Sequence, residues 1–544
     1  MDLECKNEHN SEEFVEFIFR EGKLARKIIS SVGNFCISSI NSKWAVLSAS
    51  MQEASAILSR GTAYAEIPGI YGLSDLSAEN ASGILAVREQ PVLGLKGQGT
   101  YIAVIDTGIR WRHEAFINEN NTTKIEILWD QESGKIFTSD DINAALRGAN
   151  IDIPGDEIGH GTFLAGIAAG KSNDKEGFSG VAPYARLIVV KLRQAKNFLR
   201  NFYFVKEGAP AYSEVDLMTA VRFVADYVNN KEIPVSLCMG VGTSLGSHSG
   251  ASPLASMLAD EAGKIGTCVT LASGNEGNER LHFHGVVTES QPRRVELKVG
   301  ENENGIVGAI WSYAPEVYSI EIISPSGQLV RKIPSSSESV SKIDFIFEGT
   351  TVYVYYRQYE GLAGSNIIVL RFDKPAAGIW DINVYGRDLI NGEFDMWLIN
   401  REFLAEDTYL IESDPNTTIT DPANEVQCIG VSAYNHKDMS IYLKNGRGYN
   451  WYNAIKPDFA APGVQIIGPS SLSNNNYTTR SGTSVAAAFY AGMAALIQEY
   501  GIIRGNIPTM RTAEIKNITI SGCIRKTGIT YPNREWGDDE IIMS

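Results

Sequence analysis

The sequence predicts an α/β protein built on a parallel sheet with helices on both faces, together with a small N-terminal α+β module and an inserted antiparallel β jelly roll. The first observation is that apolar, strand-like runs alternate with helical patterns between residue 97 and about 287. The second is a series of strand-like runs in residues 288–405 without a helical period. The third is the return of the α/β pattern from about Val426.

The first segment, residues 1–76, mixes strand-like runs such as EEFVEFIFR with a helical pattern from about Ala49 to Leu58. It contains no set of residues suited to catalysis, and the polar stretch SDLSAENASG at its end predicts a linker. The N-terminus is acidic and lacks the basic and apolar regions of a secretory signal. We therefore expect a small module ahead of the main domain, in a protein made in the cytoplasm.

The main domain is expected in two parts, residues 77–287 and 406–544. Its predicted buried strands include TYIAVID, RLIVVKL, IPVSLCMGV and GTCVTLAS, and CIGVSAYN belongs to the second part. Helical patterns lie between the strands, for example at Val215–Val228 and Pro253–Gly263. The longest apolar run, Val485–Ile497, is too short and too rich in alanine to cross a bilayer, so we expect no membrane partner.

Residues 288–405 interrupt this domain. Runs such as RRVELKV, GIVGAIWS, YSIEIISPSG and NIIVLRFD follow one another with turn residues between them. Consecutive strands of this kind are typical of an antiparallel sandwich or jelly roll.

The composition excludes several functional classes. The 544 residues carry a net charge of −16 and have a pI of about 5.1, so a nucleic-acid partner is not expected. The cysteines are widely scattered, without a C-x-x-C pair or a Cys/His cluster, and we expect free buried thiols, no metal and no cofactor. These cysteines are Cys5, Cys36, Cys238, Cys268, Cys428 and Cys523.

Four polar residues stand where predicted strands end or helices begin. Asp106 closes the strand TYIAVID before a Thr-Gly turn, and His160 lies between two glycines in DEIGHGTFLAG. Asn275 follows a buried strand in TLASGNEGN, and Ser484 opens the helix SVAAAFYAGMAALI. Each residue also has a purely structural interpretation: a turn aspartate, a surface histidine, a turn asparagine and a helix N-cap.

Together, however, the four have the residue types of one catalytic machine. An aspartate orients a histidine, the histidine takes the proton of a serine that attacks a carbonyl, and an amide donor binds the oxyanion. The chain order Asp106, His160, Ser484 is that of subtilisin, and differs from the orders in chymotrypsin and the α/β-hydrolases. We predict that these three residues are catalytic and that Asn275 is the oxyanion donor.

A second Gly-Thr-Ser occurs in GVGTSLGSHSG, where Ser244 completes the G-x-S-x-G pattern of a nucleophile elbow. An elbow passes directly from a strand into a helix, but the next helix is predicted to begin only near Ser252 and Pro253. This alternative would also leave the Asp106 and His160 motifs without a role. We expect Ser244 to lie in a loop beside the substrate cleft.

The motifs VIDTG, GHGTFLAG, SGNEGN and SGTSVAA together resemble the subtilase family of serine endopeptidases. The resemblance implies that the backbone of Leu237–Gly240 pairs with an extended peptide by strand addition. It also implies that Ala272–Gly274 walls the pocket for the residue before the cleaved bond. The substrate-binding residues predicted in this way are Leu237, Met239, Gly240, Ala272, Ser273 and Gly274.

Longer stretches, among them HEAFINENNTTKIEILWDQ and GITYPNREWG, resemble the Csp-type subtilases, which include bacterial spore-germination proteases. This likeness implies that residues 1–76 are a prodomain, which assists folding and is cut off by the enzyme itself near Leu73–Asn80. It implies in addition that residues 288–405 form a jelly roll. Germination members of that group activate a cortex-lytic hydrolase by cleaving its pro-form, which implies an association with spores.

The predicted function is therefore that of a serine endopeptidase which cleaves protein substrates and retains its own prodomain non-covalently. The alternative is a catalytically silent scaffold that binds a protein partner through the jelly roll and an uncleaved prodomain.

Overall fold

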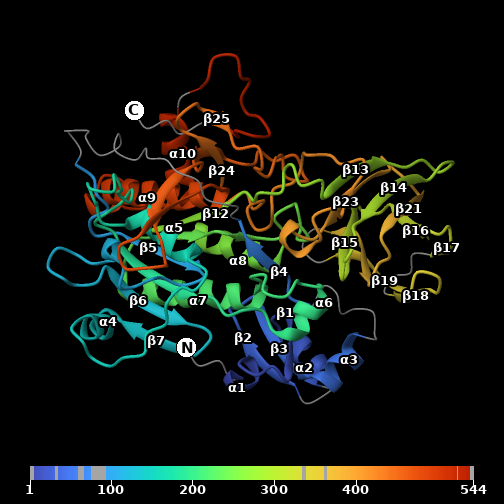
Figure 1. The fold of residues 1–544 in the computed structure, drawn as a ribbon, viewed down its shortest axis with the longest axis horizontal. Coiled ribbons are helices and arrows are strands. Elements are labelled where there is room, and N and C mark those ends of the chain that lie inside the picture. Colours follow the sequence, from blue (N-terminus) through green and yellow to red (C-terminus); the bar gives the residue numbers. More distant parts are fainter. Residues whose placement is uncertain are drawn as a thin grey trace.

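A largely parallel sheet forms the centre of the computed structural model (Figure 1). The structure describes residues 5–30, 35–58, 67–74, 94–333, 339–360, 364–523 and 525–538. Within these ranges the sheet has nine strands, of which β25 and β7 at its ends run antiparallel to their neighbours. In spatial order the strands are β25 (Ser440–Ile441), β24 (Ile429–Asn435), β12 (Thr267–Ala272), β10 (Val235–Met239), β5 (Tyr101–Asp106), β8 (Arg186–Lys191), β6 (Ile125–Asp130) and β7 (Lys135–Thr138), with β26 (Phe459–Pro462) also beside β24.

Helices cover both faces of this sheet, because its strands are apolar on both sides. Ile102 and Val104 of β5 belong to the apolar core on one face, and Ala103 and Ile105 to the core on the other. The α/β fold class predicted from the sequence is thereby confirmed. The first core includes α4 (Ser139–Leu146), α5 (His160–Ala169), α9 (Thr483–Gln498) and α10 (Thr512–Gly522), and the second includes α7 (Glu214–Lys231) and α8 (Pro253–Ala262).

Helix α9 passes through the interior of the main domain. It continues into a π-helical turn, η5 (Glu499–Ile503), and its alanines lie against α5 and the sheet. Among the described residues, Thr483–Ile503 is one helical stretch long and apolar enough to cross a membrane, and 67% of its most apolar window is buried inside the protein. Core helices of this kind meet the same criteria of length and composition.

The N-terminal module, drawn in blue in Figure 1, has a three-stranded antiparallel sheet. Helix α3 begins at Met51, two residues after the predicted start, and the strand-like run EEFVEFIFR gives β1. The elements of the module are α1 (Lys6–His9), β1 (Phe14–Arg20), α2 (Lys23–Ser30), β2 (Cys36–Ser39), β3 (Trp44–Ser50) and α3 (Met51–Leu58).

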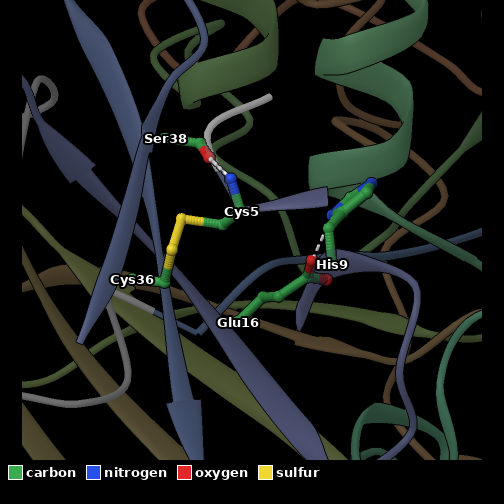
Figure 2. Close-up of a disulfide and its surroundings, with 5 residues drawn as sticks. All are labelled: Cys5, His9, Glu16, Cys36 and Ser38. Carbon is green, nitrogen blue, oxygen red and sulfur yellow. Dashed lines mark hydrogen bonds and ion pairs between the residues drawn. A yellow bond between two sulfur atoms is a disulfide. The ribbon is translucent and has the colours of Figure 1, made fainter. Parts of the chain in front are cut away.

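A disulfide joins Cys5 and Cys36 in this module (Figure 2). The prediction that all cysteines are free thiols is therefore wrong for this pair. Helix α1 packs against β1 and places Cys5 beside β2, with the two Cα atoms 5.7 Å apart and the Cys5 N–H donating to Ser38 Oγ. A separation of 31 residues gives no sign of this contact in the sequence. Cys238, Cys268 and Cys428 are buried thiols, as expected, whereas Cys523 is only half-buried.

The inserted segment forms two antiparallel sheets that share one apolar core. They extend past both predicted boundaries, because β13 begins at His282 and β23 ends at Leu410. One sheet contains, in spatial order, β13 (His282–Val286), β22 (Glu393–Leu398), β15 (Gly305–Ser312), β20 (Ser365–Asp373), β19 (Thr350–Glu360) and β18 (Ser339–Phe345). The other contains β17 (Leu329–Ile333), β16 (Val317–Ile323), β21 (Gly378–Arg387), β14 (Arg293–Val299) and β23 (Tyr409–Leu410). We refer to this unit as the β-sandwich.

Short elements connect these parts. A three-stranded antiparallel sheet lies where the N-terminal chain enters the main domain, and a hairpin precedes α9. They are β4 (Ile70–Leu73), β9 (Tyr212–Ser213), β11 (Val241–Gly242), β27 (Ile466–Pro469), β28 (Tyr477–Arg480), η3 (Glu114–Phe116), α6 (Asn197–Phe202) and η4 (Arg401–Phe403).

Candidate active site

Three separate elements bring Asp106, His160 and Ser484 together. Asp106 is the last residue of β5, His160 the first of α5 and Ser484 the second of α9. Helix α5 can approach the end of β5 this closely because Gly161 has no side chain. A Cβ there would lie 2.3 Å from the carbonyl oxygen of Gly108 and 3.1 Å from Asp106 Cβ. The glycines around the histidine therefore allow the close contact.

His160 lies between an acid and a hydroxyl. Its Nδ1 is 2.8 Å from Asp106 Oδ1, and its Nε2 is 3.1 Å from Ser484 Oγ. The backbone N–H of Thr107 also donates to Asp106 Oδ1, over 2.8 Å. All three side chains of the group are buried. This arrangement allows the imidazole to take a proton from the serine while the carboxylate stabilises the imidazolium that forms.

Asp156 supports this arrangement and was missed in the sequence. Its Oδ1 accepts from Thr107 Oγ1 and from the N–H of Gly159, and its Oδ2 accepts from both the N–H and the hydroxyl of Thr162. It thus joins the turn after β5 to the first turn of α5, the two segments that carry Asp106 and His160. The feature of the sequence that could have indicated Asp156 is an acidic residue four positions before the histidine, in DEIGH.

Asn275 lies after β12 and contacts the start of α9. Its Oδ1 accepts a hydrogen bond from the Thr483 N–H over 3.1 Å, which fixes the orientation of the amide. Its Nδ2 is buried and has no hydrogen-bond partner among the described residues. The N–H of Ser484 lies in the first turn of α9, where helical N–H groups have no partner inside the helix. A side-chain amide and a backbone N–H at the start of α9 are the two kinds of donor that bind an oxyanion.

Ser244 lies in a different environment. Its hydroxyl donates to Asn400 Oδ1 over 3.0 Å, and its N–H donates to the same oxygen over 2.9 Å. The nearby His248 directs Nε2 at the Ser244 carbonyl oxygen and not at its hydroxyl. Ser244 therefore holds Asn400 of the sandwich against the main domain.

Comparisons with known proteins agree with the fold and with the motifs of the site. The subtilase family model matches residues 97–368 and 401–537. The chain belongs to the subtilase family. The structure of the CspB protease of Clostridium perfringens is similar, with a TM-score of 0.76, 29% sequence identity and coverage of 85% of this chain and 94% of that one.

Two relatives show how far the similarity extends along the sequence. The C5a peptidase of Streptococcus pyogenes is 25% identical over 441 residues, which is 74% of this chain and 35% of that protein. The major intracellular serine protease of Bacillus subtilis is 26% identical over 260 residues, which is 46% of this chain and 66% of that protein. The chain thus spans about a third of the length of the C5a peptidase that it matches.

In this subtilase, strand β4 pairs with the segment that follows Gly240. It pairs antiparallel with β11, with Leu73 opposite Val241 and Gly72 opposite Gly242. Ser74 continues the pairing, because its N–H donates to the Gly240 carbonyl oxygen over 3.0 Å. A Cβ on Gly240 would lie 3.1 Å from Ser484 Cβ and 3.0 Å from His160 Cε1. Ser74 therefore pairs with Gly240, the residue that lies against His160 and Ser484.

The backbone pairing predicted for Leu237–Gly240 occurs further along the chain. Leu237 and Met239 lie in the middle of the large sheet, where β10 pairs with β5 on one side and with β12 on the other. Strand addition at these two residues is therefore wrong, since both edges of β10 are occupied. The edge that pairs with an extended segment begins at Gly240 and continues into β11, where β4 and Ser74 occupy it.

Ala272, Ser273 and Gly274 follow one another at the end of β12. Ala272 packs in the core, and Ser273 is buried and accepts a hydrogen bond from the Thr420 N–H through its carbonyl oxygen. Gly274, with a φ of 89°, lies against the Thr420 side chain. Of these three residues, Gly274 is the one that faces β11. The Thr420 side chain lies between Gly274 and Gly242 of β11.

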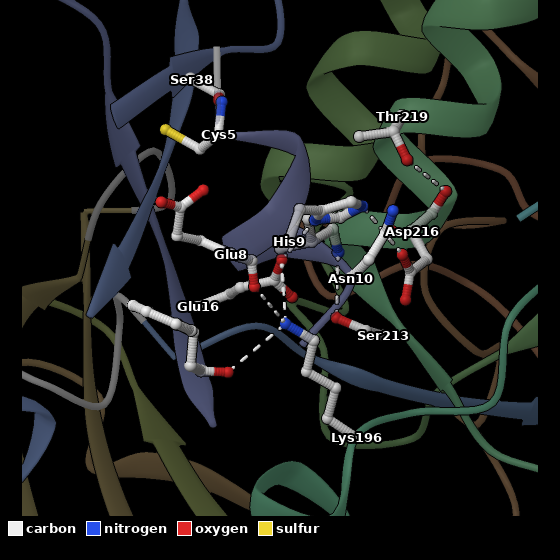
Figure 3. Close-up of polar contacts among 12 residues, drawn as sticks. Cys5, Glu8, His9, Asn10, Glu16, Ser38, Lys196, Ser213, Asp216 and Thr219 are labelled. Atoms are coloured by element: carbon white, nitrogen blue, oxygen red, sulfur yellow. Dashed lines mark hydrogen bonds and ion pairs between the residues drawn. The ribbon is translucent and has the colours of Figure 1, made fainter. Parts of the chain in front are cut away.

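The N-terminal module contacts the main domain through buried charges (Figure 3). Lys196 Nζ lies 3.5 Å from Glu16 Oε1, and His9 Nδ1 contacts the same oxygen. Arg193 donates to the His9 carbonyl oxygen and to Asp216 Oδ1, each over 2.8 Å. Burial alone would raise the pKa of Glu16, but the neighbouring His9 and Lys196 lower it to about 2. The carboxylate therefore stays charged and links the two parts.

Proposed function

We propose that this subtilase is a serine endopeptidase with Ser484 as nucleophile, His160 as general base and Asp106 as the acid that orients the histidine. The observation that carries the proposal is the position of the His160 ring, with Nδ1 2.8 Å from Asp106 Oδ1 and Nε2 3.1 Å from Ser484 Oγ. Family membership and the similarity to the CspB protease support the same chemistry.

In this mechanism Ser484 Oγ attacks the carbonyl carbon of the substrate, and its proton passes to His160 Nε2. The negative charge on the carbonyl oxygen is stabilised by the Ser484 N–H and by Asn275 Nδ2, which has no other partner among the described residues. His160 then gives its proton to the leaving amine. Water attacks the acyl-enzyme in the second half of the reaction and restores Ser484.

We propose further that the N-terminal segment is a prodomain that the enzyme cleaves itself, within Leu73–Asn80. Ser74 is the last residue of this range that the structure describes, since residues 75–80 lie outside the described part of the chain. The bond that follows Ser74 is the best candidate, because the chain approaches Ser484 at this residue.

The cleaved prodomain is proposed to stay bound. The buried charge cluster of Glu16, Lys196 and Arg193 and the pairing of β4 with β11 do not depend on a covalent link after Ser74. His160 and Ser484 are both buried, so a substrate that uses the same edge would have to displace residues 72–74 from β11 while the charge cluster holds the rest of the module.

The test is expression of the full chain beside its Ser484→Ala variant. Wild type is expected to lose an N-terminal fragment of about 8 kDa, in proportion to the 59.4 kDa of the whole chain, and Ser484→Ala to remain intact. Ser244→Ala is the matched control, since it removes the other Gly-Thr-Ser hydroxyl and should leave cleavage unchanged. A folded wild type that stays full length would instead support the alternative, a silent scaffold that binds a protein partner.

The finer proposal concerns the substrate. On the resemblance to Csp-type subtilases, we propose that the protein acts on the pro-form of a spore-cortex hydrolase. Incubation of that pro-form with wild type, but not with Ser484→Ala, should yield a shortened product. An unchanged pro-form with an otherwise active enzyme would separate the peptidase activity from this role.

A further inference from the structure

A loop of the main domain, residues 418–424, lies against the strand that pairs with β4. Its Asp421 and Thr243, next to β11, exchange two backbone hydrogen bonds, of 2.9 and 3.0 Å. The loop therefore holds the side chains of Thr420 and Asp421 at fixed positions beside residues 70–74. We call this segment the 418–424 loop.

Asp421 binds the side chain of Tyr71. The Tyr71 hydroxyl donates to Asp421 Oδ2 over 3.0 Å, and the Ser252 hydroxyl donates to the same oxygen over 2.7 Å. Tyr71 is 1% exposed and Asp421 is fully buried, so water does not replace either hydrogen bond. Asp421 Oδ1 has no partner among the described residues. Burial raises the pKa of Asp421 to about 7, and the hydrogen bonds from Ser252 and Tyr71 oppose that rise.

The surroundings of the Tyr71 ring are largely apolar. Tyr71 belongs to a buried cluster that also contains Val241, Leu254, Ile419 and Ala423. A carboxylate next to such a cluster is costly to bury unless a hydroxyl reaches it. The pocket that Tyr71 fills is thus suited to an aromatic ring that carries a hydroxyl at its tip.

Thr420 occupies the space between two glycines. A Cβ on Gly242 would lie 2.4 Å from Thr420 Oγ1, and a Cβ on Gly274 would lie 2.5 Å from the same atom. Gly242 belongs to the strand that pairs with β4, and Gly274 precedes Asn275 of the candidate site. The Thr420 side chain therefore fills the slot between Gly274 and Gly242, which is two residues along the chain from Gly240, whose carbonyl oxygen binds the Ser74 N–H.

We propose that the 418–424 loop sets the sequence specificity of the proposed peptidase, with Asp421 selecting a tyrosine at the fourth residue before the cleaved bond and Thr420 restricting the residue directly before that bond to a small side chain. The inference rests on the proposed function and on cleavage after Ser74. In the chain itself these positions are Tyr71 and Ser74.

A phenylalanine would fit the same pocket but would remove one of the two hydrogen bonds to Asp421 Oδ2. Sites that bind a substrate hydroxyl with buried polar groups discriminate strongly against the analogue without it, because the group is left unpaired. A large residue directly before the bond would instead collide with Thr420. The two side chains thus impose different requirements on one peptide.

The test for Asp421 is an internal competition between two peptides of residues 67–80, one natural and one with phenylalanine in place of Tyr71. Wild-type enzyme is expected to cleave the natural peptide about 10- to 100-fold faster at low peptide concentration, as product ratios from mass spectrometry would show. Asp421→Ala should cleave both equally, and Asp421→Asn, whose amide oxygen can still accept, should retain the preference. Equal cleavage of both peptides by wild type would overturn the proposal, even if Asp421→Ala does not fold.

The test for Thr420 uses the natural peptide against one with leucine in place of Ser74. Wild type is expected to prefer the natural peptide by about tenfold or more, and Thr420→Gly should reduce or reverse this preference because the slot opens. Thr288→Gly is a control, since it truncates a threonine that is exposed in a turn of the β-sandwich. An undiminished preference in a folded Thr420→Gly variant would contradict the role of Thr420.

The two proposals can fail separately. If wild type cleaves peptides without any preference, the specificity proposal fails and the peptidase stands. If no peptide is cleaved, a fluorophosphonate does not label Ser484 and the full chain keeps its N-terminal fragment, the proposed function fails. Recognition of the tyrosine by Asp421 is then tested by binding alone. The same peptides compete with a fluorescein-labelled peptide of residues 67–80, and equal binding of the tyrosine and phenylalanine peptides would overturn the specificity proposal.

Discussion

In the described part of this subtilase, two buried aspartates are each hydrogen-bonded to a buried histidine, and a serine hydroxyl contacts the histidine in one of these two pairs. Asp106 contacts His160 at the end of the parallel sheet, over 2.8 Å. Asp395, on β22 of the sandwich, contacts His282 Nε2 over 2.9 Å. In both pairs the side chains are almost completely buried. The pairs differ in what surrounds them.

In the sandwich every polar atom of the pair has a partner. His282 Nδ1 faces the carbonyl oxygen of Asp414, so both of its ring nitrogens face acceptors. Asp395 Oδ1 also contacts His284, and Trp451 Nε1 donates to its Oδ2 over 2.7 Å. The His282 ring stacks on Trp397 at 4.7 Å between centroids. This pair joins the sandwich to the rest of the chain and has no atom available for chemistry.

The candidate site, by contrast, contains buried polar atoms that have no hydrogen-bond partner among the described residues. The second nitrogen of His160 faces a hydroxyl, and both Asp106 Oδ2 and Asn275 Nδ2 lack a partner among the described residues. Buried polar atoms without partners are costly and therefore uncommon in structures. A carboxylate–histidine pair thus indicates catalysis only where neighbouring polar groups lack hydrogen-bond partners that a substrate could supply.

Replacing each aspartate by asparagine should separate the two pairs most clearly. Asp106→Asn is expected to lower kcat by about 10⁴-fold, because an amide favours the wrong tautomer of His160. Asp395→Asn should leave kcat within about twofold but lower the free energy of unfolding by about 2 kcal/mol, because an amide cannot accept from both His282 and Trp451 and leaves a buried donor unpaired. Peptide hydrolysis measures the first effect, and urea unfolding followed by tryptophan fluorescence measures the second. Equal loss of activity in two folded variants would contradict the distinction.

Asn275→Ala tests whether the unpaired amide is used. Loss of one oxyanion donor is expected to lower kcat by about 10²- to 10³-fold, with little change in KM, because the donor acts mainly on the transition state. Steady-state kinetics on a peptide substrate would measure this. Unchanged turnover in a folded variant would remove Asn275 from the mechanism. The expected effect is smaller than that of Asp106→Asn because the Ser484 N–H remains.

Much of this site could be predicted from the sequence because each member has a local signal. Asp106 ends an apolar strand, His160 stands between glycines, and Ser484 opens an alanine-rich helix. Parallel strands place their carboxyl ends at one edge of a sheet, so these signals converge. The alternation of strands and helices predicted the main sheet for the same reason.

The remaining features depend on residues that only folding brings together. Tyr71 and Asp421 are 350 positions apart, and neither stands in a motif. His9 and Asp216 meet across the boundary between the module and the main domain, and Cys5 forms its disulfide through the packing of α1. The sequence places the peptide-pairing edge at Leu237 and Met239 of β10, which is wrong. Apolar residues look alike in sequence whether their strand is central or at the edge of a sheet. Contacts of this kind carry no periodicity and no spacing rule.

The smallest expected effect is a pH dependence of the stability near the Asp395 pair. It comes from His284, which is hydrogen-bonded to Asp395. The hydrogen bond to Asp395 raises the pKa of His284 above its usual value of 6.5, although partial burial opposes the rise. Its contribution to stability is therefore fully present below about pH 6.5 and is lost as the pH rises through the raised value. Because the side chain is 42% exposed, solvent screens the pair and the loss should stay below about 1 kcal/mol. Unfolding of wild type between about pH 6 and pH 9 should show this decline, and His284→Gln should remove it without changing kcat at either pH. A decline that persists in His284→Gln would assign the titration to another group.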